Sequence, residues 1–259
     1  MSEFSGALDE AKRTAAAAGD LLRDHYSRTG EVRFKGEVNL VTDADTASQD
    51  LIYERLSRAF PGHDFLGEEG LEQLSGSDFR WVIDPLDGTT NFAHRLPVFC
   101  VSIALEVRGA LACGVVFNPM SGEMFWAERG GGAFLGGHAI RVSGISDLGG
   151  ALVATGFPYD LRTSRTNVAQ HERFLLRSQA VRRCGSAAID LCYVACGRFD
   201  GFWELKLNPW DTAAGAVIVG EAGGRVTDFG GRPVDIYHPE VLASNGCLHE
   251  AMLAVLSGK

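Results

Sequence analysis

The stretch Trp81-Val82-Ile83-Asp84-Pro85-Leu86-Asp87-Gly88-Thr89-Thr90-Asn91-Phe92 decides the fold, because it joins an apolar segment to acidic and hydroxyl side chains. Its first three residues predict the end of a buried strand, and we expect Asp84 where that strand leaves the sheet. Pro85 cannot donate a ladder hydrogen bond, so strand pairing should stop there. Gly88 permits a tight turn beyond it. The sequence therefore places the carboxylates of Asp84 and Asp87 on one short loop.

These two carboxylates allow more than one interpretation. Two acids this close repel each other, and burying them costs several kcal/mol unless a cation is paired with them. A divalent metal ion that carries a phosphate would remove the repulsion. Ordinary turn chemistry is the alternative, because Asp, Pro and Gly are all favoured in turns. Phosphatases that form an aspartyl-phosphate have Asp-x-Asp-Gly-Thr, and the extra residue between Asp84 and Asp87 argues against that class.

Composition narrows the class of protein. The 259 residues suffice for one large domain or two closely packed halves, and 46% of them are hydrophobic, as in an ordinary globular protein. The net charge of −9 argues against a nucleic-acid partner, since phosphate backbones need basic surfaces. No apolar run is long enough for a membrane span and no signal peptide is recognisable. We therefore expect a cytoplasmic location, no nucleic-acid partner and no membrane partner.

The first half of the chain predicts helices followed by a largely antiparallel sheet. Apolar residues at three- and four-residue spacing indicate an amphipathic helix over residues 3–27. A second helix should begin at Thr42-Asp43-Ala44-Asp45 and end at Pro61-Gly62. The strands expected after it cover residues 65–67, 99–107, 111–117 and 123–127.

The second half alternates between strand and helix patterns, which is typical of an α/β arrangement. The strands expected here cover residues 152–155, 180–183, 201–204, 225–228 and 241–244. The helices expected between and after them cover residues 165–178, 186–196 and 211–222, with a last one from residue 248. We place a soft boundary between the two halves near residue 145, where a turn-rich segment separates the patterns.

Other acidic residues follow predicted strand ends or begin predicted helices. Gly67-Glu68-Glu69-Gly70 has adjacent carboxylates, and because neighbouring strand residues point to opposite faces, one of them should join Asp84. Asp211, like Asp43 and Asp45, begins a predicted helix, where plain N-capping is the alternative role. These motifs offer oxygen ligands, without a paired His or Cys motif. Oxygen-only sites favour Mg²⁺ over Zn²⁺.

Three motifs, in this order and spacing, resemble the inositol monophosphatase family. They are Gly-Glu-Glu at 67–69, Trp-Val-Ile-Asp-Pro-Leu-Asp-Gly-Thr-Thr-Asn-Phe-x-His-x-x-Pro at 81–97 and Trp-Asp-x-Ala-Ala-Gly at 210–215. The resemblance runs from Lys35 to Asn245. It implies the fold class α/β (α+β), as a layered αβαβα sandwich of the inositol monophosphatase and fructose bisphosphatase type. It also implies one domain over residues 1–259, with soft halves at 1–145 and 146–259, and a homodimer.

The residues after Asp87-Gly88 bear on the branch of the family. Thr-Thr-Asn-Phe resembles the inositol monophosphatases, whereas Lys or Arg at Thr90 would indicate nucleotide or histidinol phosphatases, and Ser-Ser-Asn fructose bisphosphatases. The implied activity is Mg²⁺-dependent, lithium-sensitive hydrolysis of myo-inositol monophosphate by a metal-activated water. The alternatives are the same chemistry on histidinol phosphate, 3′-phosphoadenosine 5′-phosphate or fructose 1,6-bisphosphate, or a non-catalytic partner-binding role.

The resemblance assigns the metal ligands. Glu68, Asp84 and the carbonyl group of Leu86 would hold one Mg²⁺. A second ion would be held by Asp84, Asp87 and Asp211, so that Asp84 bridges the two ions. A third and looser ion would rest on Glu68, which gives two or three Mg²⁺ ions in all.

It also assigns catalytic and supporting roles. Glu68, Thr89 and Asp45 would be catalytic, with Asp45 orienting Thr89, which positions the attacking water and helps to deprotonate it. Glu69 would support the site, and Lys35 would lie on a mobile loop that closes over the metals.

The resemblance implies two sets of substrate contacts, one to the phosphate group and one to the sugar alcohol. The amides of Gly88 and Thr89 would hold the phosphate, and the hydroxyl groups of the sugar alcohol would meet Asp87, Glu204 and the segment Gly185-Ser186-Ala187. For Glu204, a surface carboxylate at a strand end is the alternative interpretation.

Overall fold

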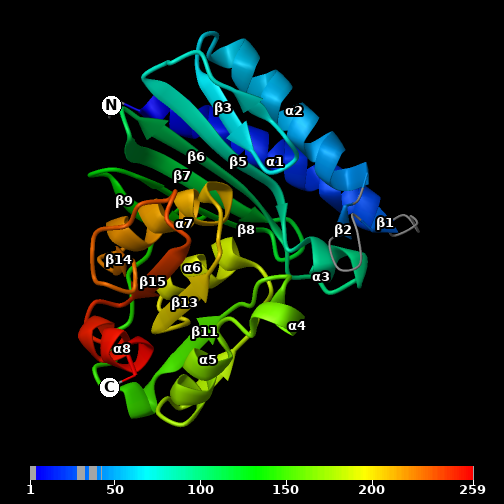
Figure 1. Ribbon diagram of the computed structural model, residues 1–259. Helices are drawn as coiled ribbons and strands as arrows, with labels where there is room; N and C mark the ends of the chain where they lie inside the picture. The colour runs from blue at the N-terminus through cyan, green and yellow to red at the C-terminus, as the bar shows by residue number, and fades with distance from the viewer. Residues whose placement is uncertain (1–3, 28–32, 35–39, 42, 259) are drawn as a thin grey trace.

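The computed structural model describes residues 4–27, 33–34, 40–41 and 43–258, which form helices and sheets in alternating layers (Figure 1). On one outside lie α1 (Ser5–Ser27) and α2 (Asp43–Ala59). The helices between the two large sheets are α6 (Ala187–Ala195) and α7 (Pro209–Glu221). The opposite outside carries α5 (Val168–Leu175) and α8 (His249–Leu256). This is the αβαβα sandwich expected from the sequence.

The first large sheet has the strand order β10-β9-β8-β7-β6-β5-β3-β4. Its strands are β3 (Asp64–Gly67), β4 (Glu72–Gln73), β5 (Phe79–Asp87), β6 (Cys100–Val107), β7 (Ala110–Asn118), β8 (Glu123–Glu128), β9 (Gly132–Leu135) and β10 (His138–Ala139). Neighbours are antiparallel, except that β3 and β5 run parallel. Because parallel strands run towards the same edge, Glu68 and Asp84 lie side by side there, and the Glu68 N–H donates to the Ile83 carbonyl at 3.3 Å.

The second large sheet has the order β12-β11-β13-β15-β14. Its strands are β11 (Leu152–Thr155), β12 (Ala180–Arg182), β13 (Gly201–Leu205), β14 (Arg225–Thr227) and β15 (Glu240–Ser244). β12, β11 and β13 are parallel, whereas β15 pairs antiparallel with both β13 and β14. Glu204 and the residues after Thr155 therefore lie at one edge of this sheet. The short elements are β1 (Arg33–Phe34), β2 (Leu40–Val41), α3 (Thr89–Ala93), η1 (Leu148–Gly150) and α4 (Leu161–Ser164).

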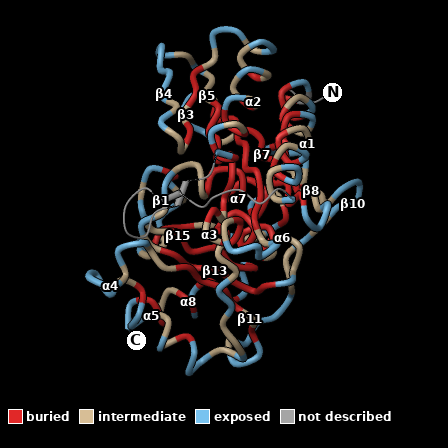
Figure 2. Tube along the Cα trace, turned by 90° about the vertical axis from the view of Figure 1, so that its right-hand side faces the viewer, coloured by how far each residue is buried: buried red, intermediate tan, exposed pale blue. Residues whose placement is uncertain are grey.

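The layers enclose three apolar clusters, and Figure 2 shows buried residues along α7 and the adjoining strands. β7 and α7 pack closely, and a Cβ atom at Gly114 would meet the Ala214 backbone at 2.8 Å. Each large apolar side chain buried in these layers contributes roughly 1.5–3 kcal/mol to folding. Among the described helices, none combines the length and the apolar composition that a membrane span requires.

Strand β5 differs from the prediction that pairing stops at Pro85. It continues to Asp87, with Asp84 opposite Ser102 and Asp87 opposite Cys100, so the register shifts by one extra residue on β5. Proline removes one ladder hydrogen bond, and a bulge accommodates this loss within the strand. Strict alternation would point residues three apart to opposite faces. The bulge brings the carboxylates of Asp84 and Asp87 to the same side.

The helix predicted over residues 165–178 is shorter than expected. Within that range α5 covers Val168–Leu175, α4 ends before it at Ser164, and the segment between the two contains Arg165 and Asn167 with φ of 51° and 69°. A left-handed backbone conformation ends a helix, and the Asn167 side chain turns inward to bond the second sheet. The two-residue strands β4 and β10 were not predicted either, since segments this short have no hydrophobic period.

Candidate active site

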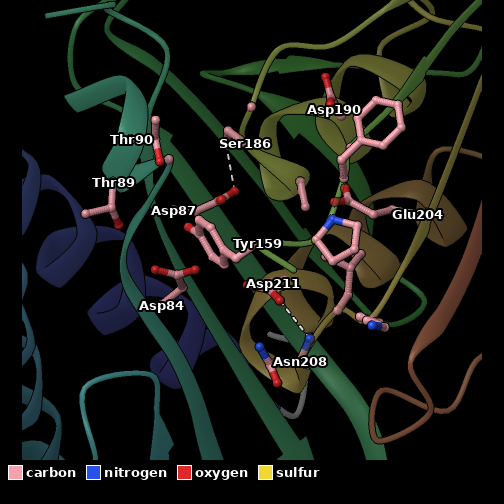
Figure 3. A pocket seen from close by; sticks show the side chains of 18 of the residues that line it. Asp84, Asp87, Thr89, Thr90, Tyr159, Ser186, Asp190, Glu204, Asn208 and Asp211 are labelled. Atoms are coloured by element: carbon pink, nitrogen blue, oxygen red, sulfur yellow. Dashed lines mark hydrogen bonds between the residues drawn. The ribbon is translucent and has the colours of Figure 1, made fainter. Parts of the chain in front are cut away.

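A pocket opens where the carboxyl ends of β3, β5, β11 and β13 and the amino ends of α6 and α7 converge (Figure 3). It brings together residues far apart in the sequence. Those predicted from the sequence that line it are Glu68, Asp84, Leu86, Asp87, Gly88, Thr89, Gly185, Ser186, Ala187, Glu204 and Asp211. The site thus draws on both sheets and on the helix layer between them.

Asp84 is buried at the bulge of β5 and faces the other predicted metal ligands. Its Oδ1 accepts a hydrogen bond from the Leu86 N–H at 3.0 Å. Burial raises the pKa of Asp84 well above its usual range, and the nearby charges of Glu68, Asp87 and Asp211 raise it further. Burial and the charges of Asp211 and Asp45 likewise raise the pKa of Glu68. These acids therefore resist ionising together as long as no cation lies among them.

Asp87 is held from the side of α6. Its Oδ2 accepts hydrogen bonds from the Ser186 hydroxyl and the Ala188 N–H, each at 2.7 Å. Burial raises the pKa of Asp87, while these two donors act in the opposite direction. Gly88 follows with φ 100°, and a Cβ atom there would lie 2.9 Å from the Val98 carbonyl oxygen, so only glycine fits this turn.

Thr89 begins α3 and is buried against α2. Its hydroxyl group lies 3.3 Å from Asp45 Oδ1 and 3.2 Å from the Leu86 carbonyl oxygen, and it can donate a hydrogen bond to either oxygen. Asp45, in the first turn of α2, is fully buried behind the pocket. The structure thus places Asp45 in contact with Thr89, in the arrangement that the resemblance implies.

Asp211 lies in the first turn of α7, but it is not the N-cap. Asn208 holds that position, and its N–H donates to Asp211 Oδ2 at 2.7 Å. Burial and the charge of Asp87 raise the pKa of Asp211, and the bond from Asn208 opposes them. Asp211 is therefore the third helical residue of a capping box, and the same carboxylate lines the pocket.

The far end of the pocket is also acidic. Glu204 lies at the end of β13 and is buried, so the surface-carboxylate interpretation is wrong. Burial raises its pKa well above the usual range, with a further contribution from Asp190. Arg183 lines the same end, is exposed, and lowers the pKa of both acids.

Among the side chains of the pocket that were not predicted, Asp190 and Tyr159 have strongly raised pKa values. Asp190 is buried in α6 with one carboxyl oxygen, Oδ1, that finds no hydrogen-bond partner, and burial raises its pKa to about 8. Tyr159 lines the pocket with a side chain that is 56% exposed, and desolvation of its hydroxyl group together with the charges of Glu68, Asp87 and Asp211 raises its pKa to about 12. Asp190 sits four residues after Ser186, and that spacing from the predicted segment was the available signal.

Other predicted residues lie outside the pocket wall. Glu69 is not among the lining residues, and its backbone N–H and carbonyl groups both bond the Gln49 side chain. One of the two adjacent acids therefore joins Asp84, as expected, and it is Glu68. Lys35 lies outside the described residues, so its place over the metals stays a prediction.

The donor set of the pocket fits a hard divalent cation. Glu68, Asp84, Asp87 and Asp211 supply carboxylate oxygens, and the Leu86 carbonyl lies beside them. Mg²⁺ prefers such ligands, and its charge would offset both the desolvation that raises the four pKa values and the repulsion that raises those of Glu68, Asp84 and Asp211 further.

Comparisons with known proteins identify the family of the chain. The sequence model described as the inositol monophosphatase family matches residues 6–258. Inositol monophosphatase 3 of Solanum lycopersicum is 42% identical over 257 residues, covering 96% of this chain and 96% of that protein. The Nus factor SuhB of Escherichia coli (strain K12) is 44% identical over 252 residues, covering 95% of this chain and 94% of that protein. The structure of an inositol monophosphatase from Anabaena (Nostoc) sp. PCC 7120 has a TM-score of 0.92 and 39% identity, covering 99% of this chain and 97% of that chain.

Proposed function

This chain belongs to the inositol monophosphatase family, and from that premise we propose that it is a Mg²⁺-dependent phosphomonoesterase acting on myo-inositol monophosphate. The observation that carries the proposal is the pocket in which two buried acids, Asp84 and Asp87, and two half-buried acids, Glu68 and Asp211, lie next to the Thr89–Asp45 pair. A cluster of this kind is costly to fold without a cation, so it argues for a working metal site.

The acids divide naturally into two ligand sets. Glu68, Asp84 and the Leu86 carbonyl would hold one Mg²⁺, and Asp84, Asp87 and Asp211 a second, with Glu68 available to a looser third ion. Such ions, when bound, neutralise the charge of the phosphate and lower the pKa of water. The bonds from Ser186 and Ala188 to Asp87 and from Asn208 to Asp211 keep these carboxylates oriented.

The protein's own contribution to proton transfer centres on Thr89. When its hydroxyl group donates towards Asp45, its oxygen can accept a hydrogen bond from the water that attacks phosphorus. The proton of that water would pass to Thr89 as the Thr89 proton passes to Asp45. The Gly88 and Thr89 amides, at the start of α3, would bind the phosphate oxygens.

The far end of the pocket would receive the alcohol portion of the substrate. Glu204 offers a carboxyl group to the hydroxyls of a sugar alcohol, next to Ala187 at the start of α6. A second phosphate at this end would meet two acids, Glu204 and Asp190, against the guanidinium of Arg183 and the ammonium of Lys206, which is already paired with Asp160. The site therefore favours a polyol monophosphate over fructose 1,6-bisphosphate or 3′-phosphoadenosine 5′-phosphate.

Phosphate release from a substrate panel, with and without Mg²⁺, tests the proposal. The panel contains myo-inositol 1-phosphate, histidinol phosphate, 3′-phosphoadenosine 5′-phosphate and fructose 1,6-bisphosphate. Mg²⁺-dependent preference for inositol phosphate supports the substrate assignment, and millimolar Li⁺ should then slow turnover. Preference for another compound would support the metal-dependent chemistry and contradict the substrate assignment. Histidinol phosphate is the strongest alternative substrate, because its ammonium group would pair with Glu204 and Asp190.

A partner-binding role is the second candidate, favoured by the similarity to a protein named Nus factor SuhB. Asp87→Asn separates the two roles, since it removes a ligand charge while keeping the shape of the side chain. A cellular phenotype that survives in this variant, while hydrolysis is lost, would support the partner role. We also propose a cytoplasmic homodimer; a monomeric mass by light scattering at micromolar concentration would contradict the dimer.

A further inference from the structure

The Glu204 carboxylate lies in a space that exists because residue 156 has no side chain. A Cβ atom at Gly156 would lie 2.1 Å from Glu204 Oε1 and 2.2 Å from Oε2, far inside van der Waals contact. The three nearest atoms all belong to this carboxyl group. Gly156 is not among the residues with positive φ, so its backbone would accept alanine without strain. The conflict is therefore with the Glu204 side chain.

Asn167 fixes the position of Gly156 relative to Glu204 through hydrogen bonds to Gly156 and to the residues that precede the two. Its Nδ2 donates to Thr155 Oγ1 and to the Gly156 carbonyl oxygen, each at 2.7 Å, and its Oδ1 accepts from Trp203 Nε1 at 2.6 Å. Both amide protons and the amide oxygen are thus used. Asn167 is 1% exposed, so these bonds are shielded from water.

The network ties the end of β11 to the end of β13. Thr155 and Trp203 are register partners, and the Thr155 hydroxyl donates to the Trp203 carbonyl oxygen at 2.6 Å. Gly156 and Glu204 are the residues that follow this pair on the two parallel strands. A shift of either strand end would break bonds of a buried polar group, which is costly.

We propose that Gly156 is a positioning residue that sets substrate selectivity: its missing side chain lets the Glu204 carboxylate lie against the end of β11, and Asn167 keeps that space open. The inference rests on the proposed function, in which Glu204 contacts the alcohol portion of the substrate. Any larger residue at position 156 pushes the carboxylate towards the space that this alcohol occupies.

The test uses Gly156→Ala in the full chain with Mg²⁺, and two substrates. p-Nitrophenyl phosphate has no hydroxyl group for Glu204 to contact, whereas myo-inositol 1-phosphate has several. We expect KM for inositol phosphate to rise about tenfold, as for the loss of one hydrogen bond to a charged group. The kcat for p-nitrophenyl phosphate should stay within about twofold.

Two further variants show whether Gly156 acts through Glu204. In a Glu204→Ala background, Gly156→Ala should have no additional effect on KM, because its steric target is absent. Gly150→Ala, at the end of η1 just before β11, is the matched control, since nothing lies within 4 Å of a Cβ atom there. Asn167→Gly tolerates the left-handed backbone and should raise the same KM; an unchanged KM would remove Asn167 from the proposal.

The outcomes separate this inference from the proposed function. An equal rise of KM in the Glu204→Ala background, or equal loss on both substrates, overturns the inference. If the wild-type protein hydrolyses p-nitrophenyl phosphate but not inositol phosphate, the proposed substrate fails instead. Crystal structures of wild type and Gly156→Ala then decide the inference alone, because a Glu204 carboxylate that has not moved in the variant would overturn it.

Discussion

Asp84 is the residue through which both proposed ligand sets connect, and its carboxylate is 1% exposed. Replacing it by asparagine keeps the size and removes the charge. We expect Asp84→Asn to lower kcat/KM at least about 10³-fold, since transition-state electrostatics typically supply several kcal/mol. Titration calorimetry should show no high-affinity Mg²⁺ binding.

Asp78→Asn, at the opposite end of β5, is the control for that variant. Asp78 pairs with Arg108 on the surface, so this substitution should leave kcat/KM and Mg²⁺ binding as in the wild type. Undiminished Mg²⁺ affinity in Asp84→Asn would contradict the ligand assignment.

Asp190 should make stability depend on pH. Burial raises its pKa to about 8, so between roughly pH 4 and 8 the folded protein keeps a proton that the unfolded chain has lost. The Asp190 contribution to the free energy of unfolding therefore falls as pH rises through this window, by at most about 1.4 kcal/mol per pH unit. Asp190→Asn should remove this dependence.

Denaturant unfolding of wild type and Asp190→Asn across pH 4.5–8 measures that contribution as a difference between the two proteins. The exposed Asp50→Asn variant serves as the control and should run parallel to the wild type. Parallel curves for Asp190→Asn as well would show that Asp190 is ionised in the folded protein throughout the range.

At the scale of elements, Ser186 links α6 to β5. Its hydroxyl group accepts from the Ile189 N–H as the N-cap and donates to Asp87 Oδ2. Ser186→Ala should lower the free energy of unfolding by about 1–2 kcal/mol, the usual cost of losing an N-cap. It should also weaken Mg²⁺ binding, because Asp87 loses a donor that orients it.

Ser186→Thr is the matched variant, since it keeps the hydroxyl group in a residue that also caps helices. Thermal unfolding and Mg²⁺ titration of both variants separate the two effects. If Ser186→Ala loses stability but binds Mg²⁺ normally, the serine is a cap alone.

Much of the element order could be predicted, because the long strands and amphipathic helices carry clear hydrophobic periods. The strands β6, β7 and β8 and the helices α2, α6 and α7 all lie close to their predicted limits. The resemblance then supplied the acids that line the pocket. The resemblance predicts that aspartates stand at positions 84 and 87. That both side chains point to the same side of the sheet depends on the bulge in β5.

The remaining features depend on tertiary contacts. Asn167 interrupts a helical pattern because its side chain finds three buried partners on the second sheet, and no local rule contains those partners. Asp190 looks in the sequence like any acid in a helical first turn. It becomes part of the site only because α6 is packed on both sides and its amino end points into the pocket.

At the scale of the whole molecule, the pocket joins the layers. Glu68 and Asp84 come from the first sheet, Asp211 from the helix layer and Glu204 from the second sheet. A cation held by Asp84 and Asp211 therefore cross-links residues of both proposed halves, 1–145 and 146–259. We propose that these halves form one cooperative domain.

Mg²⁺ should raise the temperature of a single unfolding transition. A ligand at 100 times its Kd stabilises the folded state by about 2.7 kcal/mol, which for a chain of this size corresponds to roughly 5–10 °C in Tm. Calorimetry with and without Mg²⁺ measures the shift. Asp84→Asn should abolish it, whereas Glu204→Gln, which alters the alcohol end of the pocket, should keep it. Two transitions, of which Mg²⁺ shifts one alone, would show that the halves unfold separately and that the cation is held within one of them.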